Sequence, residues 1–166
     1  NRRDDKFGTI PPATAGNFNV YGGIYRSVRI VIKNPVYIPF QGSYEHEGGT
    51  FVTTPMVCKD SATVSIKTYV RNEEMGARKI ELRSIITDAD SKIVEKLSFT
   101  ATVQPGETHE FLQNSSSIRN PKLWSPESPY LYTVFTEVWV DGQLCDTYTS
   151  PLGFRWFSWD FAENKL

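Results

Sequence analysis

Residues 63–71 read Thr-Val-Ser-Ile-Lys-Thr-Tyr-Val-Arg, and this stretch decides the fold class of the chain. Val64, Ile66 and Val70 fall on one side of an extended backbone, because successive side chains of a β-strand point to opposite faces. The alternate positions hold mainly polar or charged side chains. A period of two is typical of a strand with one buried face and one face in water. The stretch therefore predicts a half-buried β-strand.

The same alternation returns further along the chain, separated by turn-like breaks. The inward-facing sets that it predicts are Ile80, Leu82 and Ile86, then Leu97, Phe99, Ala101 and Val103, and finally Tyr132, Val134, Val138 and Val140. Further strands are expected at 51–58 and 109–113. About seven strands with turn signals between them are typical of a β-sandwich. We therefore predict an all-β chain, with an immunoglobulin-like β-sandwich of about seven strands.

Two turns are predicted from residues that favour particular backbone angles. Residues 104–107 read Gln-Pro-Gly-Glu and fit a type II turn, because Pro fixes φ at the second position and Gly accepts a positive φ at the third. Residues 141–142 read Asp-Gly, a strong signal for a two-residue hairpin with a type I′ turn. Counting across that hairpin pairs Val138 with Cys145, so we expect Cys145 to point into the core.

Composition argues against several classes of partner. The 166 residues carry 18 basic and 19 acidic side chains, for a net charge of −1. Nucleic-acid binding depends on clustered Lys and Arg, so this balance argues against it, and likewise against a charged membrane surface. No apolar run approaches the roughly 18 residues of a membrane-spanning helix. Cys58 and Cys145 are the only cysteines. Their scarcity favours two unpaired thiols, although a disulfide stays open if the compartment is oxidising.

The residue types that carry catalysis or bind metals do not converge in this sequence. His46 begins a string that resembles the zinc motif H-E-x-x-H, but its fifth position is Thr50, so the second ligand is missing. We expect the other histidine, His109, to be a packing or surface residue. Acidic pairs lie in loops, without an apolar pocket that could raise a pKa. We therefore predict no catalytic residue, no metal site and no cofactor.

Both ends of the chain differ from its middle. Residues 1–43 are polar and rich in Gly and Pro, with strand-like material only at 23–38, and one or two strands cannot bury a core of their own. We expect this segment to be the remnant of a neighbouring domain. Residues 156–161 hold four large aromatic side chains, which indicates a surface that another element covers. Because the chain starts with Asn1 rather than Met, we expect a processed chain or, in preference, a piece of a longer one.

Three stretches carry a more specific signal. Residues 17–26 read Asn-Phe-Asn-Val-Tyr-Gly-Gly-Ile-Tyr-Arg, residues 121–132 read Pro-Lys-Leu-Trp-Ser-Pro-Glu-Ser-Pro-Tyr-Leu-Tyr, and residues 153–155 read Gly-Phe-Arg. In order and spacing they resemble glycoside hydrolase family 2, the β-galactosidase and β-glucuronidase family. The first is similar to the end of that family's N-terminal jelly-roll, the second to its immunoglobulin-like domain, and the third to the string that leads into its (β/α)₈ barrel.

The resemblance implies a division of the chain into three parts. Residues 1–43 would be the C-terminal remnant of a sugar-binding jelly-roll, residues 44–155 the immunoglobulin-like β-sandwich, and residues 156–166 the start of the link to the barrel. In this family the acid/base Glu and the nucleophile Glu lie in the barrel. A retaining glycosidase needs such a pair of carboxyl groups, and no pair in this chain replaces it. The parent is therefore expected to be a glycosidase, and the chain alone is expected to be inactive.

The resemblance also implies roles for individual residues. Where β-galactosidases of the family often carry an Asp that reaches toward the substrate, this chain has Asn17, which can still form hydrogen bonds with a sugar hydroxyl. Structural or interface roles are expected for Arg26, Trp124, Tyr130, Tyr132, Arg155, Trp156 and Trp159. The expected partners are the jelly-roll and barrel of the same polypeptide, with a β-glycoside bound through the parent. An extracytoplasmic compartment such as the periplasm is favoured.

Two functions therefore stand side by side. In the first, the chain is a non-catalytic module that braces the barrel against the sugar-binding domain. In the second, it is a stand-alone carbohydrate-binding or adhesive sandwich that uses exposed Trp and Tyr side chains as stacking platforms, since one sandwich fold hosts many functions. Ligand titration and the mass of the native polypeptide separate the two hypotheses.

Overall fold

The computed structural model describes residues 26–41 and 47–157. Contacts divide the chain into two units, Asn1–Ile32 and Lys33–Leu166, and the strands lie in the second. Asn17, His46 and Trp159 fall outside the described residues, so what the sequence predicts for them stays a prediction.

Nine strands and no helix occur in the part of the chain that the structure describes. In chain order they are β1 (Val36–Tyr37), β2 (Thr50–Val57), β3 (Ser61–Asn72), β4 (Arg78–Thr87), β5 (Ile93–Val103), β6 (Thr108–Asn114), β7 (Ile118–Arg119), β8 (Tyr132–Val140) and β9 (Gln143–Leu152). Seven of them are longer than two residues. The predicted all-β class and the strand number are confirmed.

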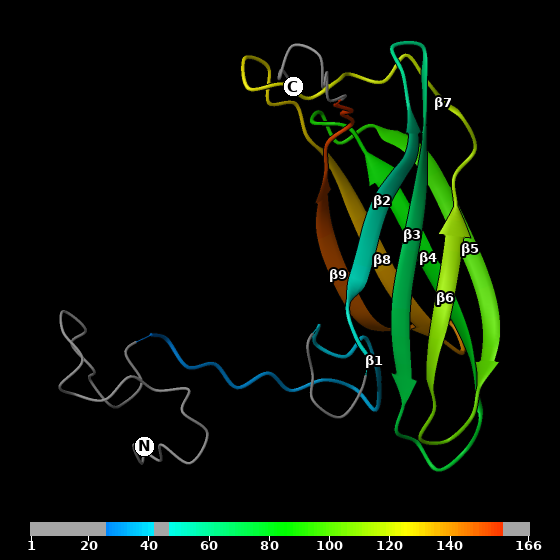
Figure 1. Ribbon diagram of the computed structural model, residues 1–166. Coiled ribbons are helices and arrows are strands. Elements are labelled where there is room, and N and C mark those ends of the chain that lie inside the picture. Colours follow the sequence, from blue (N-terminus) through cyan, green and yellow to red (C-terminus); the bar gives the residue numbers. More distant parts are fainter. Residues whose placement is uncertain (1–25, 42–46, 158–166) are drawn as a thin grey trace, which may run out of the picture. The chain divides into compact units, whose positions relative to one another are not determined.

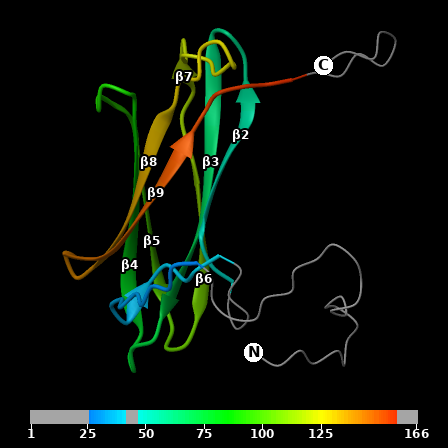
Figure 2. The same cartoon turned by 90° about the vertical axis from the view of Figure 1, so that its left-hand side faces the viewer.

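The strands form two antiparallel sheets that face each other (Figure 1, Figure 2). In sheet A, β3 is central, with β1 and β2 along one edge and β6 and β7 along the other. Sheet B has the order β5-β4-β8-β9. This is the β-sandwich that the alternating sequence predicts. No described residue belongs to a helix long and apolar enough to cross a membrane.

Every second residue of β3 is buried, from Ala62 to Asn72, as the opening stretch predicts. The alternating faces of β4 and β8 are confirmed as well. β5 departs from the expected pattern: Val103 is buried, but Phe99 is 48% exposed because β5 is an edge strand. The ring of Phe99 still reaches the opposite sheet, with its centroid 6.0 Å from that of Phe111 in an edge-to-face arrangement. The alternating pattern therefore predicts which face of the sheet a side chain lies on, but not how deeply that side chain is buried.

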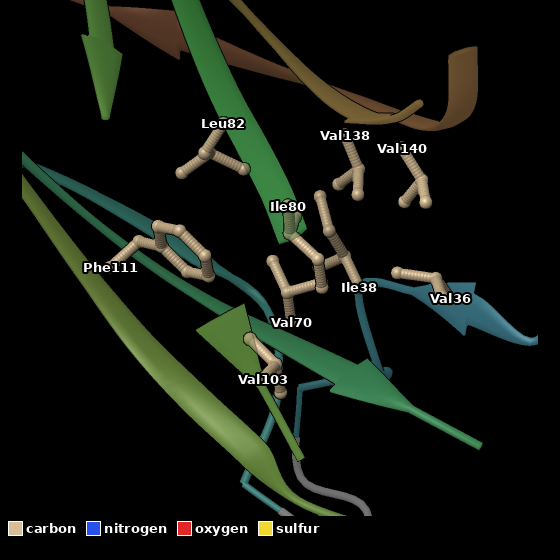
Figure 3. Packing of buried hydrophobic residues seen from close by; sticks show 9 residues of the cluster. All are labelled: Val36, Ile38, Val70, Ile80, Leu82, Val103, Phe111, Val138 and Val140. Carbon is tan, nitrogen blue, oxygen red and sulfur yellow. The ribbon is translucent and has the colours of Figure 1, made fainter. Parts of the chain in front are cut away.

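The core consists of two apolar clusters, one toward each end of the sandwich. The first surrounds Phe111 and contains Val36, Ile38, Val70, Ile80, Leu82, Val103, Phe111, Val138 and Val140 (Figure 3). The second surrounds Phe154 and contains Ala62, Val64, Ile66, Ile86, Ile118, Tyr132, Val134, Leu152 and Phe154. Residues from both sheets meet in each cluster, so burial of apolar area between the sheets stabilises the fold.

Both predicted turns are confirmed, but the strand register after the second turn is not. Gly106 has a φ of 72°, and Asp141 and Gly142 have φ values of 50° and 77°. The pairing of Val138 with Cys145 is wrong, because a bulge shifts the register and places Asp146 opposite Val138. Cys145 is therefore half-buried beside the first cluster instead of pointing into it. Both cysteines are free in the structure.

The connection between β6 and β8, residues 115–131, contains a short strand that the sequence did not predict. Ile118 and Arg119 form β7, which pairs with the start of β3 at Ala62 and Ser61. Ile118 is 6% exposed and belongs to the second cluster. A two-residue strand is too short to produce an alternating pattern, so the sequence carried no periodic signal for it.

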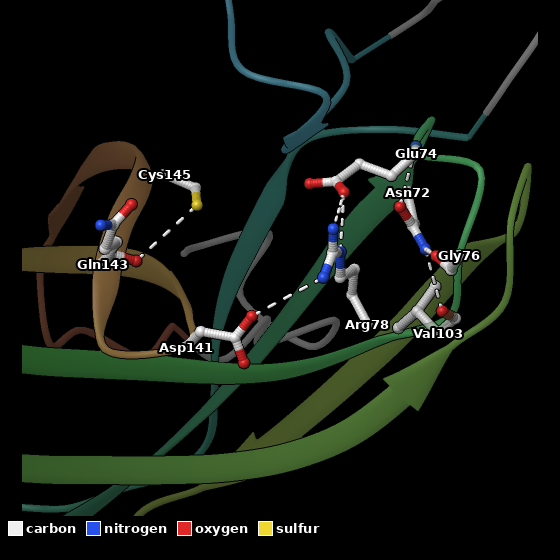
Figure 4. A network of polar contacts seen from close by, with 8 residues as sticks. All are labelled: Asn72, Glu74, Gly76, Arg78, Val103, Asp141, Gln143 and Cys145. Atoms are coloured by element: carbon white, nitrogen blue, oxygen red, sulfur yellow. Dashed lines mark hydrogen bonds and ion pairs between the residues drawn. The ribbon is translucent and has the colours of Figure 1, made fainter.

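Polar groups inside the sandwich are satisfied by specific partners. The side-chain amide of Asn72 donates to the backbone oxygens of Gly76 and Val103 at 2.9 and 3.0 Å, and its oxygen accepts from the backbone N–H of Glu74 (Figure 4). Arg78 pairs with Glu74 and also lies 3.7 Å from Asp141 (Figure 4). These contacts join the β3–β4 turn to β5 and to the β8–β9 hairpin.

Candidate functional site

The chain enters and leaves the sandwich at opposite ends. β1 pairs with Asn72 and Arg71 at the last residues of β3, and this region is named the incoming end. Phe154 packs in the cluster that contains Ala62 and Ile118, near the first residues of β3, and this region is named the outgoing end. Twelve residues of strand span roughly 36 Å at about 3.3 Å per residue. The length of β3 therefore sets the spacing between the entry of the chain and its exit.

A salt bridge between Lys33 and Asp146, named the anchor, holds the segment that leads into β1, named the incoming segment. One carboxylate oxygen of Asp146 accepts from the ammonium of Lys33 at 2.7 Å and from the backbone N–H of Ile38 at 2.9 Å. The same ammonium donates to the backbone oxygen of Ile38 at 2.8 Å. The side chains of Lys33 and Asp146 are only 20% and 14% exposed. Charge-assisted hydrogen bonds in such partly dehydrated surroundings are stronger than exposed ones. The segment that leads into β1 is therefore fixed to β9.

Sequence reasoning missed this anchor, because Asp146 reaches the inner side of β9 only through the bulge. Strict alternation after the hairpin puts the carboxylate on the outer face. The side-chain amide of Asn34 adds a contact there, donating to the backbone oxygen of Cys145 at 2.6 Å. The sequence contains no motif that predicts the bulge, so the anchor could be found only in the structure.

Three aromatic rings pack in series at the outgoing end. The ring centroids of Tyr130 and Tyr132 are 5.1 Å apart, and those of Tyr132 and Phe154 are 4.9 Å apart, both pairs edge to face. The hydroxyl of Tyr132 accepts from the backbone N–H of Lys122 at 2.9 Å, and that of Tyr130 accepts from the backbone N–H of Ala89 at 3.1 Å. Burial raises the pKa of Tyr132, so its hydroxyl stays protonated at neutral pH. These contacts fix the connection between β6 and β8 to the sandwich.

Trp124 and Arg155 form a stacked pair beside these rings. The backbone N–H of Trp124 donates to the backbone oxygen of Phe154 at 2.8 Å, next to a parallel bridge between Leu123 and Phe154. The guanidinium carbon of Arg155 lies 5.1 Å from the centroid of the Trp124 ring, which is cation–π distance. A hollow of about 340 Å³ opens here, lined by Trp124, Leu131, Pro151, Gly153 and Arg155.

The outgoing end presents apolar side chains to solvent. Leu131, Trp156 and Phe157 are 47%, 51% and 76% exposed. Clustered exposed apolar groups mark surfaces that a partner covers. With the Trp124–Arg155 pair and the hollow, these residues form what is named the outgoing surface. Its composition, aromatic with one Arg, suits a protein contact.

Of the residues that the resemblance selected, Trp124, Tyr130, Tyr132 and Arg155 lie together at this end, followed directly by Trp156. Arg26 is exposed and belongs to the other unit of the chain. Lys33, Asp146 and the contacts of Phe154 were not anticipated. The burial of Phe154 could have been predicted, because it is the apolar residue of the Gly-Phe-Arg string.

The described residues offer no group of three or more His, Cys, Asp or Glu side chains that could hold a metal ion. Hydrogen bonds from Arg83 and then from Ser98 lower the pKa of Glu81 from 4.5 to about 2. The backbone N–H of Gln104 and the His109 ring lower the pKa of Glu107 as well. Both carboxyls are stabilised as anions, the opposite of what a general acid near neutral pH requires.

Comparison with known proteins agrees with the fold. The family model for glycosyl hydrolases family 2 matches residues 49–155. A β-glucuronidase of Formosa agariphila is 30% identical over 142 residues, covering 84% of this chain and 14% of that protein. A β-galactosidase of Bacteroides ovatus is 31% identical over 138 residues, covering 83% and 15%. The crystal structure of a Bacteroides uniformis β-glucuronidase matches with a TM-score of 0.71 at 30% identity, covering 77% and 15%.

The class that these findings define is a β-sandwich module matching a small part of much longer glycosidases. The chain spans 14% and 15% of the lengths of the two curated relatives. It belongs to glycosyl hydrolases family 2, and the resemblance carried by the three sequence motifs is thereby confirmed.

Proposed function

We propose that this chain is the non-catalytic sandwich module of a larger family 2 glycosidase, and that it braces the catalytic barrel against the sugar-binding domain. The observation that carries the proposal is the separation of the two ends of the sandwich. One end holds the incoming segment through Lys33 and Asp146. The other presents the outgoing surface, with Trp156 half exposed where the described chain stops.

The proposal assigns residues 1–43 to a jelly-roll remnant, 44–155 to the sandwich and 156–166 to the link. Val36 and Ile38, each 1% exposed, lie in the first core cluster, so the end of the first segment is docked on the sandwich. In this proposal Asn17 contributes to sugar binding from the jelly-roll part. The parent acts on a β-glycoside through carboxylates in its barrel.

The bracing role is tested by stability coupling, that is, by comparing how one substitution changes the stability of the isolated chain and that of the parent. Trp156 is 51% exposed, so Trp156→Ala should leave the unfolding free energy of the 166-residue chain unchanged within about 0.5 kcal/mol. In the parent the barrel would bury that ring, and the same substitution should lower parent stability by about 3 kcal/mol. Met75→Ala, at a fully exposed turn position, is the matched control and should alter neither. An unchanged parent would overturn the proposed contact.

The chain on its own should hydrolyse no β-galactoside, β-glucuronide or β-mannoside. Turnover that persists through stringent purification and copurifies with the chain would contradict the non-catalytic role. The stand-alone carbohydrate-binding sandwich is the second candidate. It requires a native polypeptide no larger than a sandwich, which the mass of the native protein decides.

A further inference from the structure

The outer face of sheet B carries a tryptophan in a polar setting that the bracing role does not use. Strand register places four side chains in one row across the sheet: Thr100, Glu81, Trp139 and Leu144. Trp139 is half-buried and lines a hollow of about 220 Å³ together with Lys79, Glu81, Thr100, Asp141 and Gly142. The hollow lies on the face of sheet B that points away from both core clusters.

The Trp139 ring is held in place by its neighbours. Its indole N–H donates to the carboxylate of Glu137 at 2.8 Å, and the guanidinium carbon of Arg83 lies 4.5 Å from the ring centroid. Arg83 is fixed in turn by a two-pronged pair with Glu81, at 2.8 and 2.7 Å. An aromatic ring whose position is fixed before binding loses little entropy when a ligand stacks on it.

The groups around the hollow are hydrogen-bonding groups of mixed charge. Lys79 supplies ammonium donors, Thr100 a hydroxyl, and Asp141 a carboxylate acceptor. Neither Lys79 nor Thr100 makes a side-chain hydrogen bond to another described residue, so both can bond a ligand. Donors and acceptors around one flat aromatic ring match the hydroxyls and the apolar ring face of a sugar.

The same groups argue against other ligand classes. Glu81 is paired with Arg83, and Asp141 lies 3.7 Å from Arg78, so the charges around the hollow balance. Among the described residues, Lys79 is then the one cation of the lining without a charged partner of its own, and an anionic sugar or a phosphate would find no cluster of cations there. An apolar peptide needs an apolar lining, and Trp139 is the one large apolar side chain among the residues that line the hollow. A neutral ligand rich in hydroxyls needs neither a cluster of cations nor an apolar lining, so it suits the hollow.

We propose that the Trp139 hollow on the outer face of sheet B binds a short neutral oligosaccharide. This would add a glycan contact to the module, on residues that the outgoing surface does not include. It goes beyond the bracing role and does not depend on it, because it is measured on the 166-residue chain. Under this proposal both the brace and the stand-alone sandwich bind a sugar, so the mass of the native polypeptide, and not ligand titration, separates those two hypotheses.

Calorimetric titration with cellotetraose, galactotetraose and the anionic tetragalacturonate tests the proposal. At least one neutral probe should saturate with a Kd near 1 mM, and tetragalacturonate should bind at least tenfold more weakly. Trp139→Ala should weaken neutral binding at least tenfold, whereas Trp139→Phe, which keeps a stacking ring, should retain most of it. Trp124→Ala, on the outgoing surface, is the control and should bind like the unaltered chain.

Substitutions of Lys79 and Thr100, the exposed residues here named the rim of the hollow, test binding without removing a buried side chain. Lys79→Ala and Thr100→Ala alter exposed side chains and should each weaken binding several-fold. The proposal is overturned if neither neutral probe binds at about 10 mM, if tetragalacturonate binds as well as they do, or if the rim and Trp139 variants of intact fold bind unchanged. Failure here would leave the stability coupling between Trp156 and the parent untouched, and failure of that coupling would leave this binding untouched.

Discussion

Replacing Asp146 by Ala should loosen the incoming segment from the sandwich. One oxygen of this carboxylate accepts two hydrogen bonds, from Lys33 at 2.7 Å and from the backbone of Ile38 at 2.9 Å. A hydrogen bond to a charged group contributes about 1.5–3 kcal/mol, and removing one partner of a largely buried pair also leaves the other charge without compensation. Since the two side chains are 14–20% exposed, we take the lower values and expect a loss of about 3 kcal/mol.

Urea unfolding and hydrogen exchange measure this loss in two independent ways. Asp146→Ala should lower the unfolding free energy by that amount and raise the exchange rates of residues 33–38. Asp146→Asn keeps an acceptor for the Ile38 N–H but loses the charge, so its effect should be intermediate. Asp90→Ala, at an exposed position of the β4–β5 turn, is the control and should change neither. An Asp146→Ala chain within about 0.5 kcal/mol of the unaltered one, with unchanged exchange at 33–38, would refute the anchor.

Three further predictions concern stability. Asn72→Ala should cost about 2–4 kcal/mol in urea unfolding, because it removes the side-chain partner of the buried backbone oxygen of Val103 and of the partly buried backbone groups of Glu74 and Gly76. Gly48→Ala should lower the melting temperature, because its Cβ would lie 2.5 Å from the backbone oxygen of Phe40, whereas Gly76→Ala, with open space around it, should not. The pKa of Glu81 is lowered from 4.5 to about 2, so its contribution to stability is complete above pH 4.5 and is lost as pH falls toward 2. Urea midpoints of Glu81→Gln should therefore depend less on pH between 4.5 and 2.

The fold could be predicted from the sequence wherever one face of a strand is dry and the other wet. The alternation of β3 from Ala62 to Asn72 is the clearest case, and the hairpin at Asp141-Gly142 follows from positive φ values that its residues tolerate. Edge strand β5 shows where this reasoning stops. Its pattern identified the inner face correctly, but Phe99 stays half exposed because no neighbouring strand covers that edge.

The candidate site was harder to predict, because its parts depend on tertiary geometry. Family motifs selected Trp124, Tyr132 and Arg155, which the structure places at one end of the sandwich. The Lys33–Asp146 anchor depends on a bulge of one residue, and the pattern around Cys145 contains no sign of it. The setting of Trp139 likewise depends on four strands lying side by side.

The mass of the native polypeptide tests the central claim most directly. An immunoblot of cells that express the protein, with antibody raised against this chain, compares that mass with the 18.9 kDa of the sequence. A module of a larger glycosidase predicts a band several-fold heavier, with room for a barrel of about 250 residues and a complete jelly-roll. A native band near 18.9 kDa would contradict the bracing role and make the stand-alone carbohydrate-binding sandwich the leading explanation.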